Sequence, residues 1–183
     1  MIDITQTHPP RWLVIAEGEL GVREFRGRRH NVRILNYLKT ALNLGNWGRS
    51  RDETAWCAAF VNWCLEQAGE QGTNHALARS FIDWGYEIEP PRLGAIVVIR
   101  YGGNRDSTTG SMGGFHVGFL IREGRYSYRI LGGNQRDSVS YRNFPKKAYE
   151  LCAVRWPFKD PSPSIARKED PTDNQECIDD THT

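Results

Sequence analysis

Residues 54–65 read TAWCAAFVNWCL and follow a polar, turn-prone stretch of the chain. The change from polar to apolar residues predicts that a helix covers residues 54–67. Asp52 or Thr54 can cap this helix by accepting a hydrogen bond from a backbone N–H group. Cys57 would then lie in or near the first turn, where free N–H groups and the helix dipole favour a thiolate and lower the pKa of the thiol.

The alternative for Cys57 is a buried and inert thiol, because free cysteines are among the most buried residue types. The remaining cysteines, Cys64, Cys152 and Cys177, complete no CxxC pair and no Cys/His spacing typical of zinc. Cys57 and Cys64 would lie about two turns apart on one helix, too far for a disulfide. We expect Cys64 to pack in the core.

The length of 183 residues suits one domain with a single core, and 39% of the residues are apolar. No stretch approaches the roughly 20 apolar residues that span a membrane. The first ten residues lack the basic and apolar segments of a secretory signal. We therefore expect synthesis in the cytoplasm without a signal peptide, followed by export through a dedicated machine or release by lysis.

Charge is distributed unevenly along the chain. Residues 159–183 carry a net charge of −4, and because the whole chain carries +2, residues 1–158 carry +6. The acidic segment has few apolar residues and predicts a disordered tail behind a domain at 1–158. The positive charge of that domain suits a polyanionic partner such as a cell wall, although ordinary solubility explains it equally well. The sequence has no run of basic residues interleaved with aromatic residues, the pattern that would indicate binding to nucleic acid.

The sequence predicts helices first and strands afterwards, which is typical of the α+β class. Besides the helix described above, apolar residues at helical spacing predict helices at residues 11–20, 31–42 and 75–84. Runs rich in β-branched and aromatic residues predict an antiparallel meander with strands at residues 94–100, 115–121, 126–131, 138–141 and 153–156. A segment rich in Gly, Ser and Thr at residues 102–114 predicts a flexible loop.

A cysteine nucleophile needs a base, and His116 is the candidate among five histidines because it alone lies on a predicted strand. It follows a Gly-rich loop and precedes Gly118 by two residues, so we expect an imidazole open to a cleft; a hydrogen-bonded structural histidine is the alternative. Asn134 could accept a hydrogen bond from the ring and fix its tautomer, with Gln135 and Asp137 as competitors. The Gly-Gly-Asn-Gln segment could also be only a turn.

Four motifs together resemble the NlpC/P60 and CHAP superfamily of papain-like cysteine peptidases and amidases that cut bacterial peptidoglycan. They are WCAAFV at 56–61, PRLGAIVV at 91–98, GFHVGF at 114–119 and LGGNQ at 131–135. The resemblance covers roughly residues 10–158 and is closest to a branch met in phages and in type VI secretion effectors.

The resemblance implies Cys57 as nucleophile, His116 as general base and Asn134 as the residue that orients the base. It implies a papain-like fold in which the cysteine-bearing helix packs on an antiparallel sheet of about five strands. Ala95 replaces an acid that is usual in the family, at a structural position. The third catalytic position of the superfamily varies among His, Asn, Asp, Glu and Gln.

These observations predict a peptidoglycan hydrolase, an endopeptidase or amidase that cuts a stem-peptide amide through a thioester intermediate and requires no metal or other cofactor. We expect a monomeric antibacterial type VI secretion effector that acts in the periplasm of a target cell, with a secretion carrier and a cognate immunity protein as partners. A phage lysin of the same chemistry, an inactive wall-binding module and an acyltransferase on the same scaffold are the alternatives.

Overall fold

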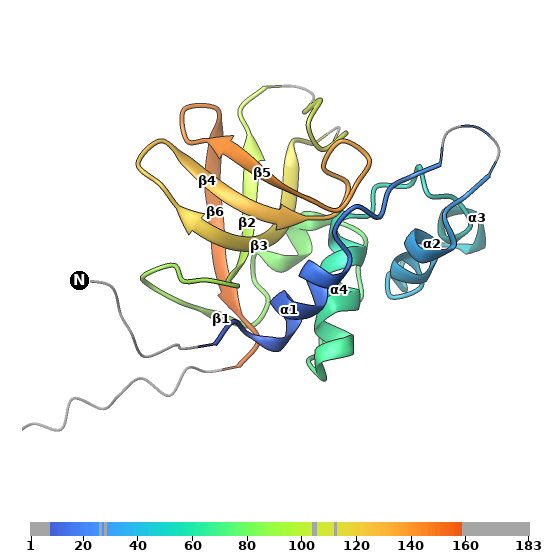
Figure 1. Cartoon of the computed structure of the whole chain (residues 1–183), viewed down its shortest axis with the longest axis horizontal. Helices are drawn as coiled ribbons and strands as arrows, with labels where there is room; N and C mark the ends of the chain where they lie inside the picture. The colour runs from blue at the N-terminus through green and yellow to red at the C-terminus, as the bar shows by residue number, and fades with distance from the viewer. Residues whose placement is uncertain (1–7, 26, 28, 104–105, 112, 159–183) are drawn as a thin grey trace, which may run out of the picture.

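The computed structural model describes residues 8–158 except 26, 28, 104–105 and 112. Within this part of the chain the helices come first and the sheet follows, which confirms the predicted α+β class (Figure 1). The acidic tail predicted at 159–183 lies outside the described residues.

Helices α1 (Arg11–Gly18), α2 (Val32–Leu38), α3 (Asn46–Arg49) and α4 (Cys57–Ala68) precede the sheet. Asn31 caps α2 by accepting a hydrogen bond of 2.9 Å from the N–H of Arg33. Gly69 ends α4 in the left-handed conformation, with φ of 88°. None of the helices in the described ranges is long and apolar enough to cross a membrane.

The helix predicted at residues 75–84 is wrong except for one 3₁₀ turn, η1 (Ala78–Phe81). Side chains compete for the N–H groups that a longer helix would need. The N–H of Ala76 donates to Asn43 Oδ1 at 2.8 Å, and the N–H of Leu77 donates to His75 Nδ1 at 3.0 Å. Local bonds of this kind offer the backbone an alternative to helical pairing.

The start of α4 also differs from the prediction. The helix begins at Cys57, and its N-cap residue Trp56 provides no side-chain cap. Neither predicted cap acts on this helix: the hydroxyl of Thr54 donates to the carbonyl of Gly48 at 2.8 Å, and Asp52 binds another part of the chain. The first-turn N–H groups of α4 therefore stay available to the thiol of Cys57.

Six strands form one antiparallel sheet in the order β1-β6-β2-β3-β4-β5, one strand more than the predicted five. They are β1 (Tyr86–Glu87), β2 (Ile96–Tyr101), β3 (Phe115–Glu123), β4 (Ser127–Gly132), β5 (Ser140–Pro145) and β6 (Tyr149–Trp156). The additional strand β1 has two residues, too few to give a periodic signal. Strands β2 to β5 form the predicted meander, but β6 pairs with β2 inside the sheet instead of extending the meander beyond β5.

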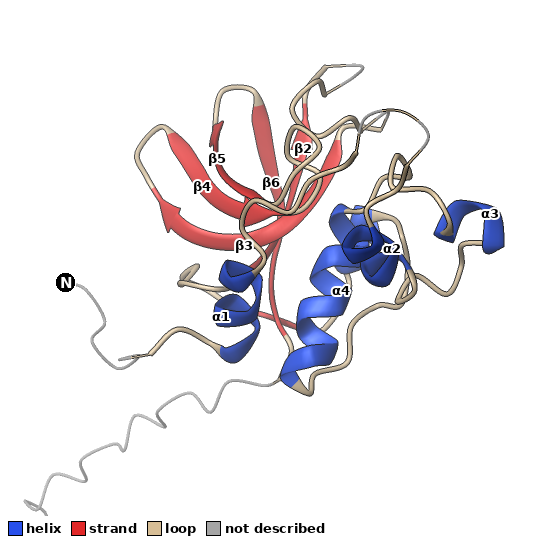
Figure 2. Cartoon of the chain, turned by 45° about the vertical axis from the view of Figure 1, so that its right-hand side comes forward, coloured by secondary structure: helices blue, strands red, loops and turns tan. Residues whose placement is uncertain are grey.

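Helices α1 and α4 pack on the sheet, with α4 against β3 and α1 against both α4 and β4 (Figure 2). Phe60 of α4 and Phe119 of β3 are fully buried, and their ring centroids lie 6.3 Å apart. Full burial of each such side chain contributes about 1.5–3 kcal/mol. This packing holds α4 beside β3, the strand that carries His116.

Candidate active site

Cys57 is the first residue of α4, and its side chain is almost buried, with 6% of its surface exposed. Burial raises the pKa of the thiol above its ordinary value, and hydrogen bonds from the backbone N–H groups of Val117, Ala58 and Cys57 itself oppose that rise. The expected lowering of the pKa by the helix start is therefore outweighed. The contact with Val117 places the sulfur beside β3, at the residue that follows His116.

His116 is completely buried, so the expectation that its imidazole opens to a cleft is wrong. The ring stacks on Phe144 with a centroid distance of 5.5 Å. Gly118 leaves no open space either: a Cβ there would lie 2.5 Å from Ile130 Cγ2 and 2.8 Å from the carbonyl oxygen of Leu131. The glycine lets β4 approach β3 closely, and the space that the sequence suggested as a cleft is filled by the neighbouring strand.

Gln135 is the residue whose side chain reaches the imidazole: its Oε1 lies 3.2 Å from His116 Nε2. Its Nε2 donates to the carbonyl oxygen of Ser140, and to that of Ile130 at 3.5 Å, which fixes the amide with Oε1 toward the ring. Because Oε1 can only accept, His116 Nε2 carries the proton. Nδ1 is then a lone-pair acceptor, and it has no hydrogen-bond partner among the described residues.

The other two candidates for this position, Asn134 and Asp137, lie in the same turn but are placed differently. Asn134, Arg136 and Asp137 all have positive φ, between 54° and 61°, and Asn134 is buried like Gln135. Asp137 lines a separate pocket at the molecular surface. The hydrogen bond to the imidazole therefore favours Gln135 over Asn134 as the orienting residue, and the catalytic role of either residue stays a prediction.

Burial also lowers the pKa of His116 to about 4, and the hydrogen bond that the ring donates to Gln135 and the charge of Asp106 only partly offset this. The imidazole is therefore neutral at pH 7. With the pKa of Cys57 raised, the resting pair consists of a neutral thiol and a neutral imidazole.

A pocket of about 380 Å³ opens beside Cys57. Besides Cys57 itself, its walls come from three segments: Ala55 before α4, residues 76–79 around η1, and the chain that leads into β3. The last segment contributes Thr109, Gly110, Ser111, Gly113 and Phe115. Most of its surface is apolar. Of this pair, Cys57 lines the pocket and His116 does not.

One buried carboxylate anchors the loop that forms a wall of this pocket. Asp106 is 2% exposed and accepts hydrogen bonds from Thr108 N, Thr109 Oγ1 and Tyr149 OH at 2.8, 2.8 and 2.9 Å. The sequence predicted only a flexible segment here. Asp followed by Thr two and three residues later is a turn-forming pattern, and this was the available signal.

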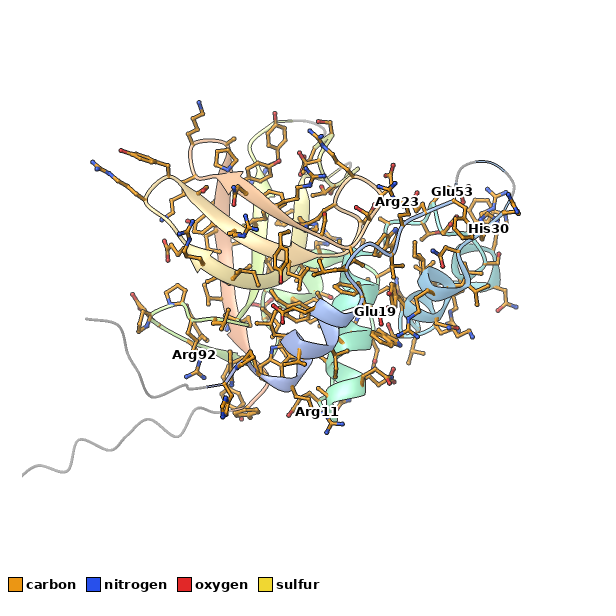
Figure 3. The ribbon with its side chains drawn as sticks, in the orientation of Figure 1. Arg11, Glu19, Arg23, His30, Glu53 and Arg92 are labelled. Atoms are coloured by element: carbon orange, nitrogen blue, oxygen red, sulfur yellow. The ribbon has the colours of Figure 1, made fainter. Side chains whose placement is uncertain are left out.

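A second buried carboxylate, Asp52, holds the chain on the other side of Cys57. It accepts hydrogen bonds from Asn31 N at 2.8 Å and Phe25 N at 3.1 Å, and His30 Nδ1 lies 2.8 Å from its Oδ1. Burial would raise the pKa of Asp52, but these hydrogen bonds hold it below its ordinary value. Glu53 also approaches His30, and the two lie at one end of the molecule with α2 and α3 (Figure 3).

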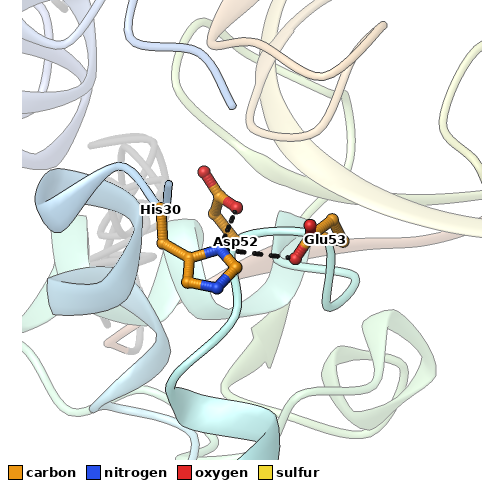
Figure 4. Close-up of side chains that lie close together, drawn as sticks. All are labelled: His30, Asp52 and Glu53. Carbon is orange, nitrogen blue, oxygen red and sulfur yellow. Dashed lines mark hydrogen bonds and ion pairs between the residues drawn. The ribbon is translucent and has the colours of Figure 1, made fainter. Parts of the chain in front are cut away.

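His30, Asp52 and Glu53 are the cluster in the described chain that could hold a metal ion, with ligand atoms within 4.8 Å of one another (Figure 4). Both oxygens of Asp52 already accept hydrogen bonds from the protein. Hydrogen bonding alone accounts for the positions of these three side chains. We interpret the hydrogen bonds of Asp52 as contacts that position the loop leading to Cys57. The sequence had suggested Asp52 as a helix cap and singled out no role for His30.

The CHAP domain family model matches residues 49–134, which is consistent with the predicted NlpC/P60 and CHAP superfamily. The matched range includes Cys57 and His116 and ends at the residue before Gln135. No match to a curated protein was found. CHAP domains are usually cysteine peptidases or amidases that act on peptidoglycan, so the match indicates a hydrolase-type function.

Proposed function

We propose that this protein is a peptidoglycan hydrolase that cuts an amide bond of the stem peptide with Cys57 as nucleophile. The match of the CHAP domain family model to residues 49–134 supports this proposal. One observation carries the proposal. The thiol of Cys57 lines a pocket, while its sulfur contacts the backbone N–H beside His116, whose Nδ1 is an unpaired acceptor among the described residues.

In the first half of the reaction, the thiol proton moves to His116 Nδ1 as the sulfur bonds to the substrate carbonyl carbon. We assign stabilisation of the negative oxygen of the tetrahedral intermediate to backbone N–H groups at the start of α4, beginning with that of Cys57. The carbon–nitrogen bond then breaks, the amine leaves with the proton from His116, and a thioester remains on Cys57.

In the second half, water attacks the thioester. His116 Nδ1 takes a proton from this water, the new carbon–oxygen bond forms, and the carbon–sulfur bond breaks. The sulfur recovers the proton and the acid product leaves. Gln135 acts as a positioning residue in both halves, because its amide holds the Nε2–H tautomer that keeps Nδ1 basic.

The decisive experiment digests purified peptidoglycan with the wild type and with Cys57→Ala, and identifies the fragments by mass spectrometry. We expect the variant to lose at least about a thousandfold in rate. Cys152→Ala is the matched control, since this half-buried thiol lies in β6 outside the pocket, and it should keep full activity.

Fragments also distinguish the reaction classes. New carboxylate and amine ends mean hydrolysis, and a new amide means acyl transfer. If Cys57→Ala digests peptidoglycan at the wild-type rate, or if the wild type binds the wall without cutting it, the proposed chemistry is wrong.

We further propose delivery of this domain as an antibacterial type VI effector that acts on the wall in the periplasm, with a carrier and an immunity protein as partners. Sequence resemblance is the support for this role, with a phage lysin as the alternative. The test expresses the protein with and without a periplasmic export signal in a bacterium. Lysis that requires both export and Cys57 is expected, whereas lysis from the cytoplasm alone would contradict wall cleavage as the cause.

A further inference from the structure

The pocket beside Cys57 contains one charged side chain among its described lining residues, that of Arg79. Five of the other lining residues are alanine or glycine: Ala55, Ala76, Ala78, Gly110 and Gly113. These small side chains leave room for a peptide backbone and offer it few polar contacts. The guanidinium of Arg79 is therefore the group in this pocket that can bind and orient a charged ligand most strongly.

The backbone that carries Arg79 is firmly held. Arg79 lies in η1 between Ala78 and Phe81, both of which are buried, and Phe81 packs against Trp84 with ring centroids 5.3 Å apart. Ser80 is fixed as well, because its hydroxyl donates to Thr73 Oγ1 at 2.9 Å. The start of the arginine side chain is thus fixed at the wall of the pocket.

The guanidinium itself has no hydrogen bond or ion pair with any residue that the structure describes. Some other arginines are engaged: Arg33 pairs with Glu19, and Arg51 stacks on Trp47. Arg79 is exposed, so a ligand can reach its guanidinium, and a planar guanidinium binds a carboxylate through two parallel hydrogen bonds.

We propose that Arg79 determines substrate specificity by binding a free carboxylate of the peptide close to the bond that Cys57 attacks. The inference rests on the proposed function and adds the substrate class: an acidic peptide whose residues next to the scissile amide have small side chains. Arg79 binds and orients the substrate, and it takes no part in proton transfer.

The first test measures alkylation of Cys57 and needs no catalytic turnover. Iodoacetate carries a carboxylate and iodoacetamide does not. With either reagent, the sulfur of Cys57 bonds to the methylene carbon and iodide leaves. Peptide mapping by mass spectrometry gives the rate at Cys57 separately from the other cysteines. We expect Arg79→Ala to lower the ratio of the iodoacetate rate to the iodoacetamide rate about tenfold, a loss typical of a charge-assisted pair.

Arg125→Ala is the matched control, because Arg125 is an exposed arginine in the turn between β3 and β4 and does not line the pocket. It should change the ratio by less than about twofold, the size of an effect of net charge at the surface. Arg79→Lys keeps the charge without the planar fork and should give an intermediate ratio. An unchanged ratio in Arg79→Ala would overturn the inference.

The second test compares two synthetic stem peptides that differ only by a carboxylate or a carboxamide beside the scissile bond. Arg79→Ala should lower kcat/KM about tenfold for the acidic peptide and less than about twofold for the amidated one. Equal losses on both peptides overturn the role of Arg79 and leave the hydrolase standing. A shifted alkylation ratio in a protein that cuts neither peptide has the opposite meaning: Arg79 binds anions, and the proposed hydrolysis is wrong.

Discussion

Cys57 lies in the helical part of the molecule and His116 in the sheet, and the two parts differ in how far they bury and hydrogen-bond their polar groups. The helical part leaves the first turn of α4 without a side-chain cap and opens a pocket beside the sulfur. The sheet buries the imidazole completely and satisfies Nε2 with a side chain whose own orientation is fixed by two carbonyl groups. In the proposed mechanism this difference separates two tasks: the helix presents the nucleophile to the substrate, and the sheet holds the proton acceptor in one tautomer.

Replacing His116 should have the largest effect on this division. We expect His116→Ala to lower kcat about a thousandfold, since general base catalysis contributes roughly 10²–10⁴. Iodoacetamide should still reach Cys57, because the pocket lies on the helical side. His8→Ala, at an exposed histidine before α1, should match the wild type. Catalysis within tenfold of wild type in folded His116→Ala, checked by circular dichroism, would mean that another base serves Cys57.

Replacing Gln135 tests whether the sheet fixes the tautomer. Gln135→Ala should lower kcat about fiftyfold while leaving KM nearly unchanged, because a mis-oriented imidazole affects proton transfer and not substrate binding. Asn134→Gly is the matched control one residue away, since glycine tolerates the φ of 57° at that position, and kcat should stay within about twofold. The reverse order of effects would return the orienting role to Asn134.

The pH dependence of activity follows from the same burial. The pKa of His116 is lowered to about 4 in the folded protein, so the base stays neutral down to that pH. An ordinary histidine with a pKa near 6.5 would lose about twenty-fivefold in activity between pH 7 and pH 5. We expect kcat/KM to fall by less than twofold over this range, apart from any titration of the substrate. An acidic limb near pH 6.5 would show that the imidazole is open to water.

The smallest effect concerns stability on the helical side. Burial, together with the charges of Asp137, Asp52 and Glu53, raises the pKa of Glu24 to about 7, although a hydrogen bond from Trp56 Nε1 at 2.8 Å opposes the rise. The folded protein therefore binds this proton more tightly than the unfolded chain does. As a result, the free energy of unfolding decreases as pH rises from about 4.5 through 7.

Glu24→Gln removes the charge and should raise the melting temperature at pH 8 by a few degrees, with little change at pH 4.5. Calorimetry at both pH values measures this difference. Glu66→Gln, at an exposed position on α4, should change neither value. A gain at pH 4.5 equal to that at pH 8 would mean that packing, and not charge, causes the change.

The sequence predicted the elements whose signal is local. The polar-to-apolar change before Cys57 predicted α4, and β-branched runs predicted β2 and β3. The same local signals failed where contacts between residues far apart in the sequence determine the structure. Asp52 was predicted to cap α4, but its hydrogen-bond partners Phe25 and Asn31 lie more than twenty residues away in the sequence. His116 looked open because Gly118 is small, and only the sheet register shows that β4 fills the space.

The choice between Asn134 and Gln135 could not be made from the motif alone. Adjacent residues in a turn point in different directions, and three residues with positive φ determine which one faces the ring. The proposed role of Arg79 could not be predicted from the sequence for a related reason. Its importance comes from a pocket built by three separate segments of the chain, and no spacing in the sequence brings them together.

The place of β6 in the sheet has a consequence for how this protein is made. Val97 in β2 pairs with Val154 in β6, so a strand from the far end of the described chain completes the interior of the sheet. A ribosome releases α4 and β2 to β5 earlier, but the sheet cannot close until residue 156 has emerged from the exit tunnel. We expect the nascent chain to lack the proposed hydrolytic activity until then, so that the activity begins only after this last strand has been translated.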